Sequence, residues 1–156
     1  MKYTTVKKFT NYTFIIFIIA MPFSRLIAQT CRIEKTQALF DSLKVKEIQC
    51  PKTVLAVAIY ETGWLECDRC SYQLNNLFGF KLRKGYIRFT NISECIDYLK
   101  KWQNLYYETW RVKHPDGTYH QFMYYIRYAR NMENYNRNLK SIEYWITENI
   151  KGAEEE

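Results

Sequence analysis

The feature that most constrains this chain is an apolar run, VLAVAIY, at residues 54–60. No side chain in the run is charged, so it belongs in a core, either as a buried strand or as a helix covered on most faces. Pro51 favours the helix, because proline is well tolerated at the first helical position. Gly63 stands where such a helix would stop, which is a common place for a residue in the left-handed conformation. We therefore predict a buried helix over residues 51–62.

A single carboxylate, Glu61, lies in the last turn of this predicted helix, between Tyr60 and Trp64. Desolvation disfavours a charged carboxylate, and so does the negative end of the helix dipole. A glutamic acid that stays protonated near neutral pH is what general acid catalysis requires. The alternative is a glutamate on the surface at a helix end, which is the common place for this residue type.

The N-terminal segment indicates an exported protein. Three lysines precede the apolar stretch FIIFIIAMPF (residues 14–23), and Ala28 offers a small residue at a cleavage point. This order is typical of a secretory signal, and the apolar stretch is short for a membrane span. We predict a signal peptide over residues 1–28, a periplasmic or secreted location and no membrane association after cleavage. An uncleaved N-terminal anchor is the alternative.

The charge of the exported part limits the choice of partner. Residues 1–28 hold four basic and no acidic residues, so their removal lowers the formal net charge from +7 to +3. A mild positive excess suits an anionic cell-wall polymer. It does not indicate nucleic-acid binding, which usually requires a clustered basic face.

The cysteines and histidines suggest structural bridges and no metal. Five cysteines in an exported chain predict one or two disulfides with one thiol left over. They are Cys31, Cys50, Cys67, Cys70 and Cys95. The CxxC at residues 67–70 lacks the flanking βαβ pattern of a redox site. His114 and His120 flank a Pro-Asp-Gly turn without a second CxxC, so we expect no metal site and no cofactor.

The remaining patterns predict a mainly α fold, as one domain over residues 29–150, and a monomer. Amphipathic periodicity predicts four further helices, over residues 36–48, 93–107, 118–130 and 134–150. The glycines of LFGFKLRKGYIRF predict a small hairpin through RKGY (residues 83–86). HPDG at residues 114–117 predicts a turn. The acidic end, residues 151–156, predicts a disordered tail.

Two of these helices make specific predictions about which side chains are buried. In the first, one apolar side is formed by Leu39, Phe40, Leu43 and Val45. In the second, apolar residues recur at Ile96, Leu99, Trp102 and Leu105, with Ser93 or Asn91 as the cap.

Four segments together resemble a known family. VLAVAIYETGW (54–64), NNLFGFK (75–81), YIRFTNISECIDYLKKW (86–102) and YARNMENYNRNLKSI (128–142) follow one another in this chain. Their order is similar to that in peptidoglycan endo-β-N-acetylglucosaminidases of glycoside hydrolase family 73, in particular small exported members of the Bacteroidetes type. The resemblance implies a lysozyme-like fold, with a helical lobe and a short hairpin around a groove for glycan strands of peptidoglycan.

The resemblance also implies roles for individual residues. The family's general acid matches Glu61, and its groove tyrosine matches Tyr128, which would orient an acetamido group or a water. Substrate-binding or positioning roles fall on Trp64, Asn76, Phe78, Gly79 and Tyr135. Asparagine offers a donor and an acceptor for sugar groups. The alternative for Phe78 and Tyr128 is a role in core packing. Trp64 either stacks on a sugar ring or packs beside Glu61.

The chain departs from the family at the second carboxylate. Glycoside hydrolysis usually uses two carboxylates, and many family members carry the second in a longer hairpin. Here the hairpin is cut down to LRKGYIR (82–88), without an acidic residue. The best substitute is Glu66, followed by Asp68, Glu94 and Asp97. Alternatively, the substrate's own acetamido group attacks the anomeric carbon.

We therefore expect a peptidoglycan hydrolase that cleaves β-1,4 bonds at N-acetylglucosamine. A lytic transglycosylase that uses a single glutamate is one alternative. A catalytically weak peptidoglycan-binding module is another, and a membrane-anchored partner of a secretion apparatus is a third.

Overall fold

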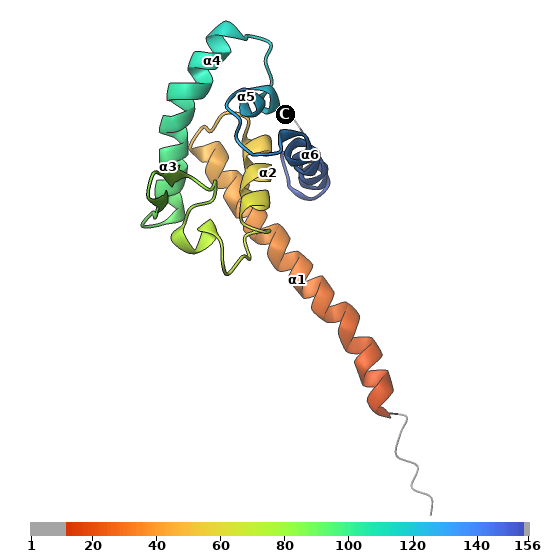
Figure 1. Cartoon of the computed structure of the whole chain (residues 1–156). Helices are drawn as coiled ribbons and strands as arrows, with labels where there is room; N and C mark the ends of the chain where they lie inside the picture. Colours follow the sequence, from red (N-terminus) through yellow and green to blue (C-terminus); the bar gives the residue numbers. More distant parts are fainter. Residues whose placement is uncertain (1–11, 155–156) are drawn as a thin grey trace, which may run out of the picture.

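The computed structural model describes residues 12–154, with side chains from residue 27 onward, and its chain is mainly helical with a small two-stranded antiparallel sheet (Figure 1). This confirms the predicted mainly α class. The helices are α1 (Tyr12–Val45), α2 (Pro51–Glu61), α3 (Ile92–Trp102), α4 (Glu108–Lys113), α5 (Tyr119–Tyr125) and α6 (Met132–Asn149). Shorter elements are the 3₁₀ turn η1 (Ser71–Leu74), the π-helical turn η2 (Gln103–Tyr107), and the strands β1 (Lys81–Leu82) and β2 (Gly85–Tyr86).

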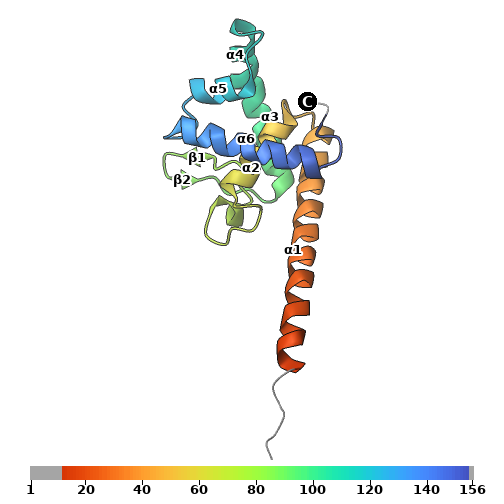
Figure 2. The ribbon, with the colours of Figure 1, turned by 90° about the vertical axis from the view of Figure 1, so that its right-hand side faces the viewer.

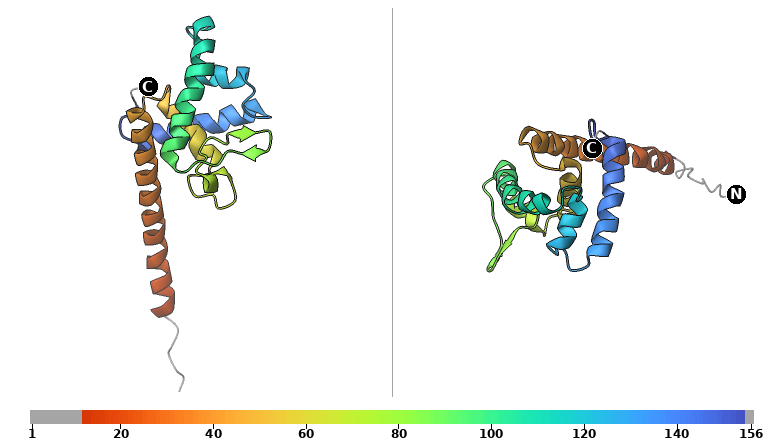
Figure 3. Two further views of the ribbon diagram at one scale, coloured as in Figure 1. Left: turned by 90° about the vertical axis from the view of Figure 1, so that its left-hand side faces the viewer. Right: turned by 90° about the horizontal axis from the view of Figure 1, so that it is seen from above.

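Helix α1 is much longer than the helix predicted over residues 36–48, and its N-terminal part projects from the rest of the molecule (Figures 1 and 3). Its last turns bury Leu39, Phe40 and Leu43 as predicted. Val45 was wrongly placed on that side: it ends the helix and is 83% exposed. The helix runs through the predicted cleavage point at residue 28, whereas residues 1–11 of the predicted signal lie outside the described part.

Helix α2 forms the centre of the domain. It packs on both α1 and α6 (Figure 2). Every residue from Val54 to Ile59 is buried, because neighbours cover all faces of the helix at once. Pro51 opens the helix and Gly63 follows it with φ of +54°, as predicted. The helix ends at Glu61, one residue earlier than predicted.

The short hairpin is confirmed where the glycines indicated it. Lys81 pairs with Tyr86 and Leu82 with Gly85, and two residues form the turn between the strands. Gly85 has φ of +131°, which suits a glycine at the end of a two-residue turn.

The second predicted helix, residues 93–107, is interrupted in a way that sequence periodicity does not reveal. The Asn91 side chain caps α3 by accepting a hydrogen bond from the Glu94 amide, which decides between the two predicted caps. After α3, η2 widens one turn before the chain continues into α4. A π turn inserts extra backbone and rotates the residues that follow. As a result Leu105, predicted to be buried, is 61% exposed, and Tyr107 is buried instead.

The two C-terminal helices have different bounds from those predicted. Helix α5 begins after a complete capping box at Thr118 but ends at Tyr125, so residues 126–130 of the predicted helix are not helical. The reason is Arg127, whose φ of +51° breaks the helix. Helix α6 begins at Met132, two residues before the predicted start, and is capped by Asn131. The predicted turn at residues 114–117 is confirmed by the hydrogen bond from the Gly117 amide to the His114 carbonyl.

The C-terminal end is ordered further than predicted. Lys151 exchanges two hydrogen bonds with the Gln37 side chain of α1, and Ala153 is fully buried. The predicted tail from residue 151 therefore starts too early, because these residues pack against α1 and α2. Among residues 12–154 no helix combines the length and apolarity needed to cross a membrane.

The register change at η2 predicts unequal costs for truncating two leucines. Leu99→Ala should lower the free energy of unfolding by about 2–4 kcal/mol, because the side chain is 3% exposed and its removal leaves a cavity. Leu105→Ala should cost less than about 0.5 kcal/mol. Urea unfolding of the two variants measures both values, and equal costs would contradict the register described here.

Candidate functional site

Glu61 is the last residue of α2, and its side chain is half-buried. The buried stretch that precedes it fixes this position, and the Thr62 hydroxyl closes the helix end by donating to the Ala58 carbonyl at 2.6 Å. Burial raises the pKa of the Glu61 carboxyl above its ordinary value. A hydrogen bond from Tyr135 and the charge of Lys81 act in the opposite direction on the same pKa. The site thus combines a desolvated acid with two groups that stabilise its anion.

Tyr135 on α6 is the direct partner of the acid. Its hydroxyl donates to Glu61 Oε1 at 2.9 Å. The ring is buried between two other tyrosines: the centroid of Tyr60 lies at 4.9 Å, edge to face, and that of Tyr128 at 5.6 Å. Burial raises the pKa of Tyr135 far above its ordinary value, so its hydroxyl keeps its proton and remains a donor to Glu61.

Tyr128, predicted to be catalytic, has a different immediate contact. Its hydroxyl donates to the Phe78 carbonyl at 2.5 Å. That bond ties the segment after α5 to the NNLFG segment beside Glu61. Tyr128 therefore lies next to Tyr135, but the Tyr128 hydroxyl is bound to the backbone. The tyrosine that contacts the acid is Tyr135.

Gly79 lies directly against the other oxygen of the acid. A Cβ atom at this position would lie 3.1 Å from Glu61 Oε2 and 3.7 Å from Glu61 Cδ. The residue also has φ of +64°, which side chains other than glycine rarely adopt. Glycine is thus required twice here, for the backbone conformation and for the space over Oε2.

Asn76 and Phe78 are buried next to the hairpin. Asn76 is fully buried: its amide donates to the carbonyls of Phe80 at 2.8 Å and Ile87 at 2.9 Å, and its oxygen accepts from the Phe80 amide. These bonds occupy the groups that were expected to meet a sugar, so they fit the positioning role. Phe78 is 3% exposed and contacts the Phe80 ring, which is a core position.

Trp64 and the candidate second carboxylate lie in another cluster. Trp64 packs edge to face on Trp145 of α6, with ring centroids 4.8 Å apart, and the Arg32 guanidinium lies over its ring at 4.9 Å. Glu66 forms an ion pair with the same Arg32 at 3.2 Å. The structure thus brings Trp64 and Glu66 together around Arg32 of α1.

Two of the remaining candidate carboxylates also have structural partners. Glu94 accepts the Thr90 amide at the start of α3, and Asp97 pairs with Lys46. Asp68 is exposed in the loop after α2.

The site contains two residues that the sequence did not single out. Lys81 and Tyr86 are register partners across the hairpin, and the Lys81 ammonium lies 4.3 Å from the centre of the Tyr86 ring. Tyr86 also lines the space next to Gly79, and Lys81 provides the positive charge that acts on Glu61. Pairing the two predicted strands residue by residue would have found both, since cross-strand partners share one face.

The cysteines and histidines form no group that holds a metal. Cys31, Cys67, Cys70 and Cys95 carry free thiols, and the Cys50 sulfur contacts the Tyr107 hydroxyl at 3.5 Å, so the structure supplies no disulfide pairing. His114 stacks on Trp110, whereas His120 pairs with Glu143 at 2.9 Å. Within residues 12–154 no set of three metal-ligating side chains comes together.

The chain matches no protein-family model, no curated protein and no solved structure.

Burial of Glu61 predicts a pH-dependent gain of stability in Glu61→Gln. The folded-state pKa lies above the unfolded value, so the native protein loses stability as pH rises from the unfolded pKa of about 4.3 through the raised folded one. The neutral glutamine has no such loss. The variant's advantage should therefore be small at pH 4, grow as pH rises and then level off.

Thermal and urea unfolding at a series of pH values measure this difference. Glu148→Gln, which removes the same charge from an exposed position on α6, is the matched control and should change stability by less than about 0.5 kcal/mol. A Glu61→Gln variant that is less stable than the native protein at pH 8 would contradict the burial argument.

Proposed function

We propose that this chain is an exported peptidoglycan hydrolase of the endo-β-N-acetylglucosaminidase type, with a lysozyme-like arrangement around Glu61. The observation that carries the proposal is the setting of Glu61 itself. The acid is desolvated, accepts a hydrogen bond from Tyr135 on one oxygen and lies beneath Gly79 on the other. The resemblance in four ordered segments supports the same function, and its acid falls on the same residue.

Proton transfer follows from this arrangement. Since Tyr135 donates to Oε1, that oxygen acts as an acceptor and leaves the proton of the neutral acid on Oε2, beneath Gly79. In the proposed reaction Oε2 gives this proton to the glycosidic oxygen as the bond to the anomeric carbon breaks. The Tyr135 hydroxyl and the Lys81 ammonium interact more strongly with the resulting carboxylate than with the acid. They therefore favour the state in which the proton has left.

The second half of the reaction is assigned to the substrate. Glu66, Glu94 and Asp97 are engaged elsewhere in the fold, and Asp68 is exposed in the loop after α2. An attack by the carbonyl oxygen of the 2-acetamido group on the anomeric carbon requires no second carboxylate. The Glu61 carboxylate then takes a proton from the water that opens the cyclic intermediate, which restores the acid.

The decisive experiment is digestion of peptidoglycan by the purified full chain, with the released fragments analysed by mass spectrometry. We expect fragments with reducing N-acetylglucosamine ends. Glu61→Gln should reduce their formation by about 10²–10⁴-fold, the usual contribution of a positioned acid. Fragments with anhydro-muramic ends would instead identify a lytic transglycosylase. No fragments from folded native protein would leave the binding module as the function.

Tyr135→Phe tests the role of the hydrogen bond to the acid. Loss of this donor removes an interaction that lowers the Glu61 pKa, so the pKa should rise further and the basic limb of the pH–activity profile should move to higher pH. The maximal rate should fall about tenfold or more, because a hydrogen bond to a charged group is lost as the proton leaves. Tyr144→Phe, an exposed tyrosine of α6, should change neither quantity. A shift to lower pH would contradict the assignment.

A further inference from the structure

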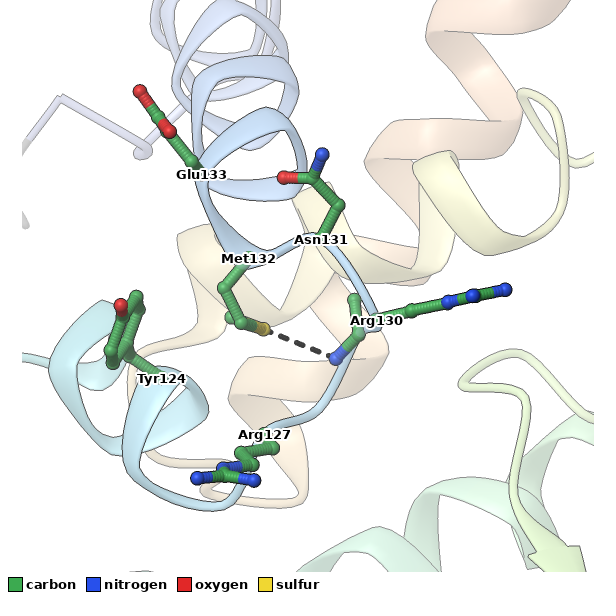
Figure 4. Close-up of a pocket in the computed structure, with 7 residues that line it drawn as sticks. Tyr124, Arg127, Arg130, Asn131, Met132 and Glu133 are labelled. Carbon is green, nitrogen blue, oxygen red and sulfur yellow. Dashed lines mark hydrogen bonds between the residues drawn. The ribbon is translucent and has the colours of Figure 1, made fainter.

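The turn between α5 and α6 encloses a hollow of about 780 Å³ (Figure 4). Its lining includes the ring of Tyr124, which is 62% exposed, and two guanidinium groups, Arg127 and Arg130. The backbone of the turn is held in place by the Ala129 amide, which donates to the Met132 sulfur at 3.1 Å. The hollow therefore carries exposed aromatic and cationic groups.

Arg127 occupies a position that favours glycine. Its φ is +51°, and the surrounding hydrogen bonds, Arg127 amide to Tyr124 carbonyl and Tyr128 amide to Met123 carbonyl, form the usual left-handed end of a helix. A residue with a Cβ atom pays roughly 1–2 kcal/mol in this conformation. This position thus combines a strained backbone with an exposed cationic side chain.

The two arginines also lack internal partners. Among the ion pairs formed within residues 12–154, none involves Arg127 or Arg130, although Glu133 lines the same hollow. In Figure 4 their guanidinium groups extend to opposite sides of the turn. Each guanidinium can bind one carboxylate by itself, through two parallel N–H···O bonds. Two cations that diverge along a turn suit an extended ligand with more than one negative group.

The segment that lines the hollow also carries two residues of the acid site. Tyr128, which follows Arg127, is bound to the Phe78 carbonyl, and Tyr135, in the first turn of α6, is bound to Glu61. The same chain segment thus supplies the partner of the acid and carries the two arginines.

We propose that Arg127 and Arg130 bind the carboxylates of the peptides attached to the glycan strand, while Tyr124 offers a face for the chain between them. This inference rests on the proposed function, because it assumes a polymer of sugars that bear short acidic peptides. It adds that the enzyme contacts the peptides as well as the sugars. A glycan strand without peptides therefore lacks the contacts with the two arginines.

The test uses the full chain with Glu61→Gln, so that no cleavage occurs during the binding measurement. Co-sedimentation is measured with insoluble peptidoglycan and, for comparison, with chitin, whose β-1,4-linked N-acetylglucosamine strands are peptide-free and bear no carboxylate. The test variant adds Arg127→Gly and Arg130→Gln. The matched control adds Lys35→Gln and Lys101→Gln, which remove the same charge from exposed positions on α1 and α3.

We expect the test variant to bind intact peptidoglycan at least about tenfold more weakly and to bind peptide-free strands as before, with the control unchanged on both. Thermal unfolding should show no loss of stability, since Arg127→Gly relieves the left-handed strain. Unchanged binding to intact peptidoglycan, equal losses on both polymers, or the same loss in the control would each overturn the proposal. Competition by double-stranded DNA as strong as that by peptidoglycan would also overturn the proposal. It would show that the arginines attract any polyanion. This readout does not depend on cleavage, so failure of the proposed hydrolase activity would be seen separately, in the digestion by native protein.

Discussion

Complete burial of α2 is the constraint on which the rest of this structure depends. A helix with no solvent-facing side between residues 54 and 59 must be covered by α1 and α6 together. Its end is the first point where a charged group can reach the surface of the core. Glu61 stands at that point, and the desolvation of its carboxyl is therefore a consequence of the packing of the helix that carries it.

The surroundings of the acid are organised by backbone contacts more than by side-chain charge. Asn76 closes the base of the hairpin through three hydrogen bonds to main-chain groups, and Tyr128 binds the Phe78 carbonyl. Gly79 then brings the main chain against the carboxyl. Such contacts set positions precisely, because the groups involved are buried and have few alternative partners. They leave Tyr135 and Lys81 as the groups that act on the charge of Glu61.

The sequence predicted those features that depend on neighbouring residues. Proline and glycine marked both ends of α2, and glycines marked the hairpin, because these residues restrict or free the backbone locally. The π turn at η2 could not be predicted, since its effect on Leu105 comes from the packing of Tyr107 and Gln103 in the core. The early end of α5 was missed for a similar reason, as an arginine gives no signal for a left-handed residue.

The same distinction applies to the candidate site: features set by neighbouring residues were predicted, and contacts between distant residues were not. Glu61 was identified from its own apolar context. Glu66 was chosen for its nearness in sequence, yet the loop turns it toward Arg32 of α1, a contact between residues 34 positions apart. The partnership of Tyr135 with Glu61 spans 74 positions, and the fold has to bring the two together. Sequence patterns named both residues, but only the arrangement of α2 against α6 showed which tyrosine binds the acid.

The reciprocal hydrogen bonds between Gln37 and Lys151 have a consequence for the order in which the molecule is completed. They join α1 to the segment that follows α6. During emergence of the chain, Glu61 precedes its tyrosine partner on α6, so the hydrogen bond between them forms only after α6 has been made. The nascent chain therefore passes through a stage in which the carboxyl is exposed to water and keeps the acidity of an ordinary glutamate. The burial that raises the Glu61 pKa is therefore completed only when α6 has packed on α2.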